Sequence, residues 1–277
     1  MNATSRPTVP PTPGDVVSMR GVSVVYETEG RRPVHALGSI DLDIRAGEVV
    51  SLIGPSGCGK STLLNVAAGL QRPTAGHVTV AGHSVTGPLP NVTAMVFQDY
   101  GLFPWFTVQR NVEVALEFQG VRASERRARA IEELRKVGLE DFLHALPKHL
   151  SGGMRQRVGI ARALSLRTPV IMMDEPFGAL DEQTRTVLGE ELSVLLANEG
   201  KTILLVTHSL SEAVFLSNRI VVMSSRPGSI KAVLEVPGDH PRTPEFMTTP
   251  EFHAIRDELF ELMHAEMRAS VLSERGG

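Results

Sequence analysis

Apolar and polar positions follow two distinct patterns in the strand-like parts of this chain. Three segments alternate apolar and polar residues: VSVVYET (22–28), SIDLDI (39–44) and HVTVAG (77–82). A period of two is typical of antiparallel strands with one buried face. Four other runs are almost wholly apolar: VVSLI (49–53), VIMM (170–173), TILLV (202–206) and IVVM (220–223). These runs predict parallel strands that are buried on both faces and connected by helices, so we expect an α/β fold.

Apolar residues at helical spacing predict two further elements. The segment SERRARAIEELRKVG (124–138) has a candidate N-cap at Ser124 and a terminating glycine at Gly138. Its predicted buried face carries Ala128, Ile131, Leu134 and Val137. This helix belongs to a helical insertion that we place at about 99–150. The later segment FHAIRDELFELMHAEM repeats apolar residues at helical spacing and is expected to pack against the core. These residues are Phe252, Ile255, Leu259 and Met263.

Length indicates one domain with an insertion. A chain of 277 residues is long for one average domain and short for two. We divide it into a Pro- and Thr-rich tail at 1–16, expected to be disordered, a main domain at 17–235 and a C-terminal helical tail at 236–277. At about 40 residues, this C-terminal tail is too short to form a separate regulatory domain.

Charge and cysteine content narrow the function classes. The net charge of −3 gives no electrostatic basis for nucleic acid as a main partner. One cysteine excludes an internal disulfide framework and fits a reducing compartment. The first residues carry no apolar signal-peptide region, and no apolar run approaches the roughly 20 residues that span a bilayer. We therefore expect a cytoplasmic chain whose link to any membrane runs through another protein.

A phosphate-binding loop follows the first wholly apolar run. GPSGCGKST (54–62) fits the pattern G-x-x-x-x-G-K-[ST], between VVSLI and the helix-like LLNVAAGL. Glycines at 57 and 59 let backbone N–H groups turn toward phosphate oxygens, and the N-terminus of the next helix adds partial positive charge. Lys60 can span the β- and γ-phosphates, Ser61 can bind Mg²⁺ and Thr62 can reach the α-phosphate. Cys58 is interpreted as a small filler. The predicted nucleotide-binding residues of this loop are Gly54, Pro55, Ser56, Gly57, Cys58, Gly59, Lys60, Ser61 and Thr62.

Polar residues at the ends of other apolar runs predict the catalytic groups. VIMMDEP ends a buried strand with Asp174 and Glu175, at the edge where α/β proteins bind ligands. Asp174 is suited to hold Mg²⁺ through water, and Glu175 to orient and polarise the attacking water; the alternative is an acidic pair that only begins a loop. His208 follows TILLV and can hydrogen-bond the γ-phosphate and the water. Gln98 follows AMVF and carries an amide that can touch Mg²⁺ or water.

A second glycine-bearing segment opens a predicted helix at HLSGGMRQRV (149–158). Ser151, Gly152 and Gly153 form another N-terminus suited to an anion, although one nucleotide needs only one such loop. LSGGMRQR resembles the signature motif of ATP-binding cassette (ABC) proteins. The phosphate loop, Gln98, VIMMDEP, Ala179-Leu180-Asp181 and His208 are similar to the family's phosphate loop, Q-loop, Walker B motif, D-loop and switch histidine, in the same order over residues 17–230.

The resemblance implies a fold, a reaction and an assembly. The fold is a P-loop NTPase cassette with a mostly parallel core sheet, an antiparallel β subdomain and a helical subdomain. The substrate is ATP with Mg²⁺, and the metal set is Ser61, Gln98 and Asp174. In the family, two subunits stack head to tail, so that each signature caps the γ-phosphate held by its partner, and Asp181 communicates across that interface. Tyr26 matches the adenine-stacking aromatic of the family; the alternative is a tyrosine that only completes a strand face.

The resemblance also implies membrane partners. DYGLFPWFTVQRNV carries five consecutive apolar residues, Leu102 to Phe106. They are interpreted either as buried core or as part of the groove that receives a coupling helix from a permease. The FPW-x-TV run, PKHLSGGMRQRV and the turn at 225–228 are similar to the nitrate/sulfonate/taurine branch of bacterial importers. This implies a peripheral subunit, paired as a homodimer, that works at the cytoplasmic face with a permease and indirectly with an extracytoplasmic solute-binding protein.

Two other function classes remain open at this stage. A soluble ABC ATPase could act on DNA or ribosomes, but repair-type members carry a long coiled coil between phosphate loop and signature, whereas Lys60 and Ser151 are only 91 positions apart without heptads. Translation-type members carry two cassettes in one chain. A non-hydrolysing regulatory cassette is disfavoured by intact Glu175 and His208.

Overall fold

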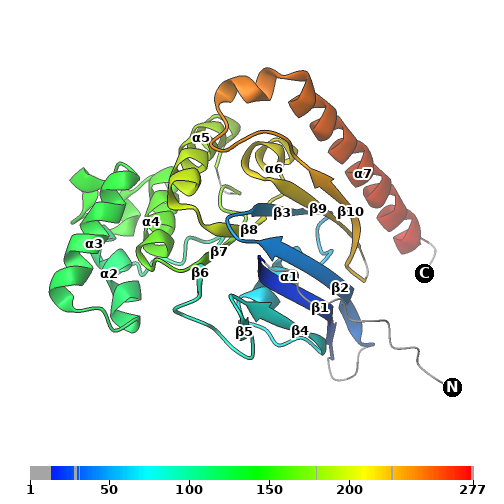
Figure 1. Cartoon of the computed structure of the whole chain (residues 1–277), viewed down its shortest axis with the longest axis horizontal. Coiled ribbons are helices and arrows are strands. Elements are labelled where there is room, and N and C mark those ends of the chain that lie inside the picture. The colour runs from blue at the N-terminus through cyan, green and yellow to red at the C-terminus, as the bar shows by residue number, and fades with distance from the viewer. Residues whose placement is uncertain (1–13, 28–29, 31, 179, 226, 276–277) are drawn as a thin grey trace.

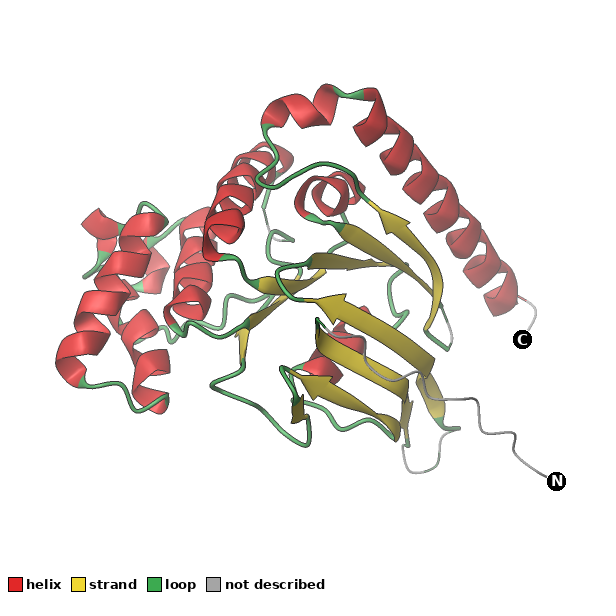
Figure 2. Cartoon of the chain, viewed as in Figure 1, coloured by secondary structure: helices red, strands yellow, loops and turns green. Residues whose placement is uncertain are grey.

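The computed structural model describes residues 14–27, 30, 32–178, 180–225 and 227–275, with side chains described as far as residue 268. Two β-sheets lie one above the other, with helices on the outer face of the larger sheet and a helical lobe at one side (Figures 1 and 2). Most of the predicted N-terminal tail, residues 1–13, lies outside the described residues, and strand β1 (Asp15–Tyr26) already begins at Asp15. No helix in the described part of the chain is long and apolar enough to cross a membrane.

The smaller sheet is antiparallel, as the alternating segments predict. Its strand order is β2-β1-β4-β5, with β2 (Val34–Arg45), β4 (Ala75–Val80) and β5 (His83–Ser84) around β1. Strand β1 pairs antiparallel with both β2 and β4. The predicted inward residues of β2 and β4 are buried: Ile40, Leu42, Ile44, Val78 and Val80.

The larger sheet is parallel except at one edge. Its strand order is β10-β9-β3-β8-β7-β6, and only β10 runs antiparallel, against β9. Its strands are β3 (Val49–Ile53), β6 (Thr93–Val96), β7 (Val170–Asp174), β8 (Thr202–Val206), β9 (Arg219–Ser224) and β10 (Ser229–Glu235). The four wholly apolar runs are thus confirmed as parallel strands.

Each face of the core sheet packs against a different layer. Val50 and Leu52 join a core with the smaller sheet and helix α1 (Lys60–Ala67). Val49 and Ile53 face the opposite core, formed with α4 (Gly152–Ser165), α5 (Glu182–Glu199), α6 (Leu210–Leu216) and α7 (Pro250–Arg275). Because both faces are covered, these strands need apolar residues at every position rather than at alternate positions.

The helical lobe has its own core, and its details correct two predictions. It contains α2 (Val108–Phe118), α3 (Ala123–Lys136), short 3₁₀ turns at Glu140–Phe142 and Pro147–His149, and one face of α4. Helix α3 begins at Ala123 with Arg122 in the N-cap position, so the prediction of Ser124 as the cap was wrong. Ala128 is exposed, whereas Ala130 and Leu134 are buried. A spacing of three residues falls about 60° short of a full turn at each step, so Ala128 points away from Val137.

The C-terminal segment covers the outer helices. Phe252 and Leu259 of α7 are buried, and Ile255 and Met263 pack partly buried against the same core, which confirms the predicted packing face. A 3₁₀ turn at Pro244–Thr248 precedes α7. Just before it, buried Arg242 donates hydrogen bonds to the carbonyl oxygens of Val214, Phe215 and Ser217 at the end of α6. Burial lowers the pKa of Arg242 to about 10, and the negative end of α6 faces this charge.

Candidate active site

A cleft of about 1090 Å³ lies over the loop that connects β3 to α1. Among the residues predicted to bind nucleotide, those that line this cleft are Tyr26, Ser56, Gly57, Gly59, Lys60, Ser61 and Thr62. Glu175 from the end of β7 lines it as well. The structure therefore brings the phosphate loop, the predicted stacking aromatic and one predicted catalytic carboxylate into one cleft.

The phosphate loop has the backbone geometry that its glycines allow. Gly57 and Gly59 have φ angles of 76° and 95°, which favour glycine, and α1 begins directly after Gly59. A Cβ at Gly59 would lie 2.5 Å from Leu37 Cδ2 and 2.9 Å from Ala36 O, so this position also lacks room for a side chain. The first turn of α1 thus presents N–H groups at the cleft, as anion binding requires.

The side chains of Lys60 and Cys58 meet inside the loop, with Lys60 Nζ 3.9 Å from Cys58 Sγ. The Lys60 ammonium is mostly buried and donates to the carbonyl oxygens of Gly54 at 2.9 Å and Pro55 at 3.1 Å. This folds a positive charge over the loop, in the cleft where a phosphate would lie. Cys58 is fully buried, and burial raises the pKa of its thiol. The thiol is therefore a packing group rather than a reactive one, in agreement with the interpretation of Cys58 as a filler.

The two predicted carboxylates differ in direction and environment. Asp174, the last residue of β7, accepts a hydrogen bond from Ser61 Oγ at 3.0 Å. Burial, together with the charge of Glu175, raises the pKa of Asp174, although the Ser61 hydrogen bond opposes this. Glu175 has a φ of 45°, a left-handed conformation that is rare for a non-glycine residue, while its N–H still donates to Val206 O at 2.9 Å. This turn directs the Glu175 side chain into the cleft instead of continuing the strand.

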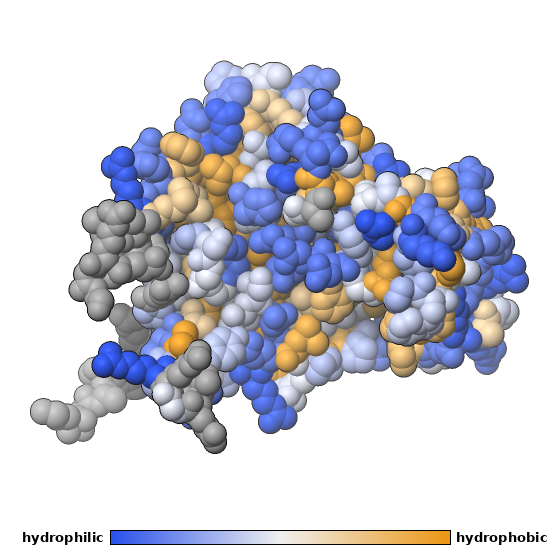
Figure 3. All heavy atoms as spheres, turned by 180° about the vertical axis from the view of Figure 1, so that it is seen from behind, coloured by the Kyte–Doolittle hydropathy of each residue, from blue (hydrophilic) through white to orange (hydrophobic). Residues whose placement is uncertain are grey.

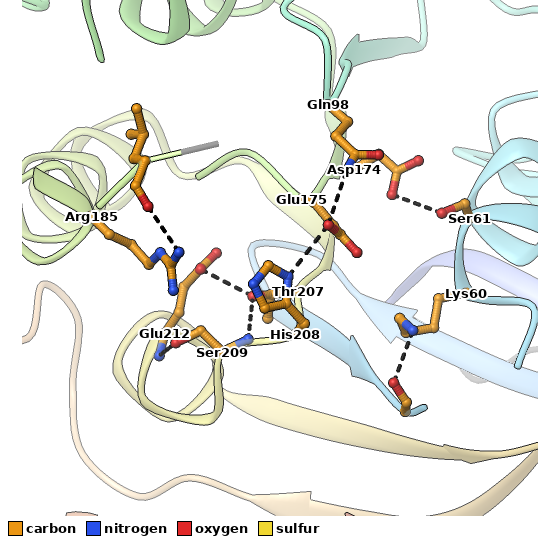
Figure 4. A network of polar contacts seen from close by, with 12 residues as sticks. Lys60, Ser61, Gln98, Asp174, Glu175, Arg185, Thr207, His208, Ser209 and Glu212 are labelled. Carbon is orange, nitrogen blue, oxygen red and sulfur yellow. Dashed lines mark hydrogen bonds and ion pairs between the residues drawn. The ribbon is translucent and has the colours of Figure 1, made fainter. Parts of the chain in front are cut away.

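Gln98 and His208 converge on the same carboxylate oxygen (Figure 4). Gln98 Nε2 donates to Glu175 Oε2 at 3.1 Å, and His208 Nδ1 lies 3.4 Å from that oxygen. The three side chains follow β6, β7 and β8, which are neighbours in the core sheet. Parallel strands end at the same edge, so residues far apart in the sequence meet there. A carboxylate held between an amide and an imidazole, and facing a phosphate loop, is suited to position and polarise a water molecule.

The second glycine-bearing segment does not join this cleft in the same chain. Ser151 is the N-cap of α4, where its hydroxyl accepts from Met154 N–H at 3.2 Å. Ser151 and Gly153 line a separate hollow of about 470 Å³ beside α5, with Thr184 and Val187. Gly152 and Gly153 pack closely, since a Cβ would lie 3.2 Å from Leu180 Cδ2 and 3.3 Å from Leu188 Cδ1 respectively. Within one chain, the signature segment is therefore open toward solvent rather than toward its own phosphate loop.

Asp181 begins α5 and lies near this hollow. Its carboxylate accepts from Thr184 N–H at 3.0 Å and from the Thr184 hydroxyl at 2.8 Å. These hydrogen bonds, the backbone one first, lower the pKa of Asp181. Ala179, which the sequence groups with Leu180 and Asp181, lies outside the described residues. Asp181 thus serves as a helix cap in the single chain, at the surface beside Ser151.

Tyr26 forms the far wall of the phosphate-loop cleft. Its ring is 43% exposed at the end of β1, and its hydroxyl donates to Gln71 Oε1 at 2.8 Å. Five residues that were not predicted from the sequence also line this cleft: Pro33, Val34, His35, Ala36 and Pro227. Pro227 belongs to the turn at 225–228, which was noted only for its resemblance; its neighbour Arg226 lies outside the described residues.

Substituting Tyr26 tests whether this wall stacks on a base. We expect Tyr26→Ala to weaken ATP binding by about tenfold, because one base–aromatic stacking contact contributes about 1–3 kcal/mol. Tyr26→Phe keeps the ring and loses only the hydroxyl, with its hydrogen bond to Gln71 and its longer one, at 3.4 Å, to Thr62 Oγ1. Its affinity is therefore expected to stay within about threefold of the wild type. Equilibrium binding of a fluorescent ATP analogue measures both. Equal losses for Ala and Phe would show that the hydroxyl, not the ring, matters.

An apolar surface lies on the helical lobe, near the loop after β6. Trp105 is 69% exposed and Phe118 is 80% exposed, whereas Phe103 and Phe106 are half-buried behind Trp105. Buried Asn111 shapes this loop, since its Nδ2 donates to the carbonyl oxygens of Phe103 and Phe106. A groove of about 350 Å³ beside it includes Phe97, Phe103 and Phe118. Hydrophobic side chains on this lobe also reach the surface among charged ones in Figure 3. The aromatic run is thus only partly buried core.

Similar sequences and structures agree with the geometry of this site. A family profile described as ABC transporter matches residues 37–178. The chain belongs to the ABC transporter family. This ABC protein is 47% identical over 239 residues to the nitrate import ATP-binding protein NrtD of Synechocystis sp., covering 84% of this chain and 90% of NrtD. It is 41% identical over 263 residues to the bicarbonate transport ATP-binding protein CmpC of Synechococcus elongatus, covering 94% of this chain and 40% of CmpC.

A solved ABC structure has the same fold. The dimeric ATP-binding cassette MJ0796, in a post-hydrolysis state bound to ADP and Pi, superimposes with a TM-score of 0.72 at 35% identity. The superposition covers 80% of this chain and all of that one. The predicted cassette fold and the resemblance to ABC transporter ATP-binding proteins are confirmed. This ABC protein is accordingly a nucleotide-binding ATPase subunit of a transporter.

Proposed function

We propose that this ABC ATPase energises the import of a small solute of the nitrate, sulfonate or taurine type. Its similarity to NrtD over most of both chains supports import, and the likeness to CmpC extends the range of candidate cargoes to another small anion. The subunit works at the cytoplasmic face of the membrane, bound to a permease. The permease and its extracytoplasmic binding protein select the cargo, because the residues of the ATPase cleft are suited to a nucleotide.

The proposed reaction uses the Glu175 cluster at the phosphate loop. A water molecule attacks the γ-phosphorus of ATP while the bond to the β–γ bridging oxygen breaks, which releases ADP and phosphate. Glu175 orients this water and takes its proton, and Gln98 and His208 fix the direction of the carboxylate through the contacts given above. Lys60 and the N–H groups of the loop stabilise the negative charge of the phosphates. The contacts of Glu175 with Gln98 and His208 are the observation on which the proposed catalytic role of Glu175 rests.

The residues at the cleft fit Mg²⁺. Ser61 Oγ and Asp174 Oδ1 lie 3.0 Å apart, and the amide of Gln98 lies on the next strand end, so three oxygen-bearing side chains are available. Among the described residues, no group of three or more His, Cys, Asp or Glu forms a metal cluster. Mg²⁺ does not need one, because it keeps several waters and binds one or two carboxylates plus phosphate oxygens. When bound, the ion neutralises charge on the phosphates; it would also offset the burial that disfavours ionised Asp174.

A second subunit completes each site. Ser151, Gly152 and Gly153 present a helix N-terminus that no nucleotide of the same chain can reach, because they line a different hollow from the phosphate loop. In a head-to-tail dimer of two copies, each signature caps the γ-phosphate held by the partner, with Asp181 beside it. The dimeric state of MJ0796 supports this assembly. Closure of the dimer then depends on the γ-phosphate, and hydrolysis removes the charge that both subunits hold.

The aromatic groove on the helical lobe receives a cytoplasmic helix of the permease. Phe97, Phe103 and Phe118 line it, and exposed Trp105 packs against Phe103 and adds apolar contact area. An amphipathic helix buries its apolar face in such a groove. Phe97 and Gly101, on either side of Gln98 in the chain, both line the groove, so a helix seated there can shift the Gln98 side chain with respect to Glu175.

A tagged chain purified from detergent-solubilised host membranes tests the transport assignment. We expect a polytopic permease at stoichiometric amount, identified by mass spectrometry, and loss of it in a Trp105→Ala/Phe118→Ala variant that keeps its ATPase activity. The permease's companion binding protein can then be screened for anions by calorimetry. Ribosomal proteins or nucleic acid in place of a membrane protein would contradict the importer and favour a soluble ABC ATPase.

A further inference from the structure

A buried carboxylate lies behind His208 and takes no part in the reaction proposed above. Glu212 is on α6 and is almost fully buried. Its Oε2 accepts a hydrogen bond from the Thr207 hydroxyl at 3.0 Å. Thr207 Oγ1 in turn accepts from Ser209 N–H at 3.0 Å, so the hydroxyl proton of Thr207 is committed to Glu212. Thr207 and Ser209 flank His208, and Glu212 therefore fixes the loop that carries the histidine.

The other side of Glu212 faces the beginning of α5. Figure 4 shows the Arg185 guanidinium pointing toward the Glu212 carboxylate. Arg185 Nη2 donates to Leu180 O at 3.0 Å, directly before Asp181, and Nη1 donates to Glu182 Oε2 at 3.2 Å. Glu212 Oε1 and Arg185 Nε are buried and have no hydrogen-bond partner in the described part of the chain. Charge attraction is therefore the force that joins the two residues.

Glu212 changes charge in the neutral pH range. Burial raises its pKa from 4.5 to about 7, while the Thr207 hydrogen bond and the positive charge of Arg185 act in the opposite direction. The other charged groups that act on it are Glu175 and Glu182, and both favour the protonated form. An unpaired charge in this position would be costly, so the ionised form depends on Arg185 and Thr207.

We propose that Glu212 is a positioning residue, which in its ionised form ties the His208 loop to the Leu180–Asp181 segment through Arg185. The connection runs from Asp181 through Leu180 O to Arg185 and from Glu212 through Thr207 to His208 by hydrogen bonds, and charge attraction joins Arg185 to Glu212 between them. It couples the start of α5 to the loop of the hydrolytic histidine. A displacement at Asp181 on dimer closure is thus transmitted to the imidazole beside Glu175. This inference rests on the roles proposed for Glu175 and His208 in hydrolysis.

The test compares the pH dependence of ATP turnover in two variants that break different sides of Glu212. Glu212→Gln keeps the acceptor for Thr207 and removes the charge that holds Arg185. Thr207→Val removes the hydrogen bond and keeps both charges. We expect the wild-type to Glu212→Gln ratio of kcat to be about tenfold at pH 8.5 and to fall toward one by pH 6, because the wild type itself becomes neutral there. The ratio for Thr207→Val is expected to depend much less on pH, and KM for ATP should stay within about twofold for both.

A double-mutant cycle identifies the partner of Glu212. Arg185→Gln alone should lower kcat at pH 8.5 about as much as Glu212→Gln does, and the two together no further. Losses that multiply, or a Glu212→Gln ratio that is constant from pH 6 to 8.5, would overturn the proposal, since a merely structural residue gives that result. Wild-type turnover and its loss in Glu175→Gln are measured in the same assay. If those two fail, the proposed hydrolytic roles fail; if only the cycle fails, Glu212 alone is misassigned.

The Glu212→Gln variant is expected to fold stably, because the pKa of Glu212 is raised, not lowered, in the folded protein. A carboxyl whose pKa is raised on folding contributes stability that is full below its unfolded value of 4.5 and is lost as the pH rises through about 7. A neutral side chain avoids this loss, so the Tm of Glu212→Gln at pH 8 is expected to equal or exceed that of the wild type. Lower turnover with a higher Tm would separate positioning from folding. A lower Tm would contradict the assignment of a costly buried charge.

Discussion

Replacing Glu175 by Gln is expected to lower the turnover number of ATP by about 10²–10⁴-fold while ATP binding is retained. An amide of the same shape can still accept from Gln98 Nε2, so the cleft keeps its form, but it cannot take the proton of the attacking water. Lys60 and the phosphate loop lie on the other side of the cleft and are untouched. Phosphate release at saturating MgATP measures turnover, and equilibrium binding of ATP measures affinity.

A matched carboxylate elsewhere provides the control for this substitution. Glu251→Gln, on the exposed surface of α7, removes the same charge far from the cleft and should leave turnover within about twofold. Asp174→Asn separates the two neighbouring carboxylates, because we expect it to raise the Mg²⁺ concentration needed for half-maximal activity. Hydrolysis that persists in Glu175→Gln at more than about a tenth of the wild-type rate would assign the catalytic carboxylate elsewhere.

The fold and the members of the cleft follow from short-range features of the sequence. The apolar runs at 49–53 and 202–206 are continuous because helices cover one face of these strands and the smaller sheet and α1 cover the other. A buried parallel strand can therefore be recognised from five consecutive residues. Polar residues directly after such runs, Gln98, Glu175 and His208, must lie at one edge of the sheet once the strands are parallel. Their approach to one another is therefore predictable, although the left-handed turn at Glu175 is not.

Features that depend on tertiary burial could not be read in the same way. Glu212 lies in LSEAVFL, where a glutamate in the first turn of a helix is typical of a solvated, dipole-favoured position. Its burial arises because α5 and the loop after β8 enclose it, and only the loop, which contains Thr207, is near Glu212 in the sequence. Arg242 is comparable: a lone arginine between prolines gives no sign that it binds the carbonyl oxygens at the end of α6. The wrong prediction that Ala128 of α3 is buried has the same cause, since three-residue spacing alone does not determine which side of a helix packs against the core.

The signature segment at Ser151 was recognised from the sequence, but its position in the single chain does not explain its function, because no phosphate group of the same chain's nucleotide lies near it. Ser151 caps α4 and faces a hollow that contains no part of the phosphate loop. An aspartate at this position preserves the cap, since Asp is as good an N-cap as Ser. It also adds a negative charge where the proposed dimer holds the partner's γ-phosphate. Ser151→Asn caps equally well without the charge and serves as its control.

Two inactive variants should therefore restore activity in a mixed dimer. Lys60→Ala and Ser151→Asp homodimers are each expected to lose ATP turnover by about 100-fold or more, through a lost phosphate ligand and a repulsive charge respectively. In a heterodimer purified through two different tags, the intact phosphate loop of one chain meets the intact signature of the other, while the second site carries both lesions. With one of two sites intact, about half of the wild-type rate per dimer is expected.

The contrasting pair is Lys60→Ala with Glu175→Gln. Both lesions lie on the same half of a site, in the phosphate-loop cleft of one chain, so each site of that heterodimer keeps one defect and no activity should return. Recovery in the first pair and not in the second requires that the signature acts on the partner's nucleotide. Inactivity of both heterodimers, with dimers present by native mass spectrometry, would contradict the head-to-tail arrangement. Recovery in both would instead show that turnover in a mixed dimer does not require an intact site, because the second pair has no intact site in any arrangement.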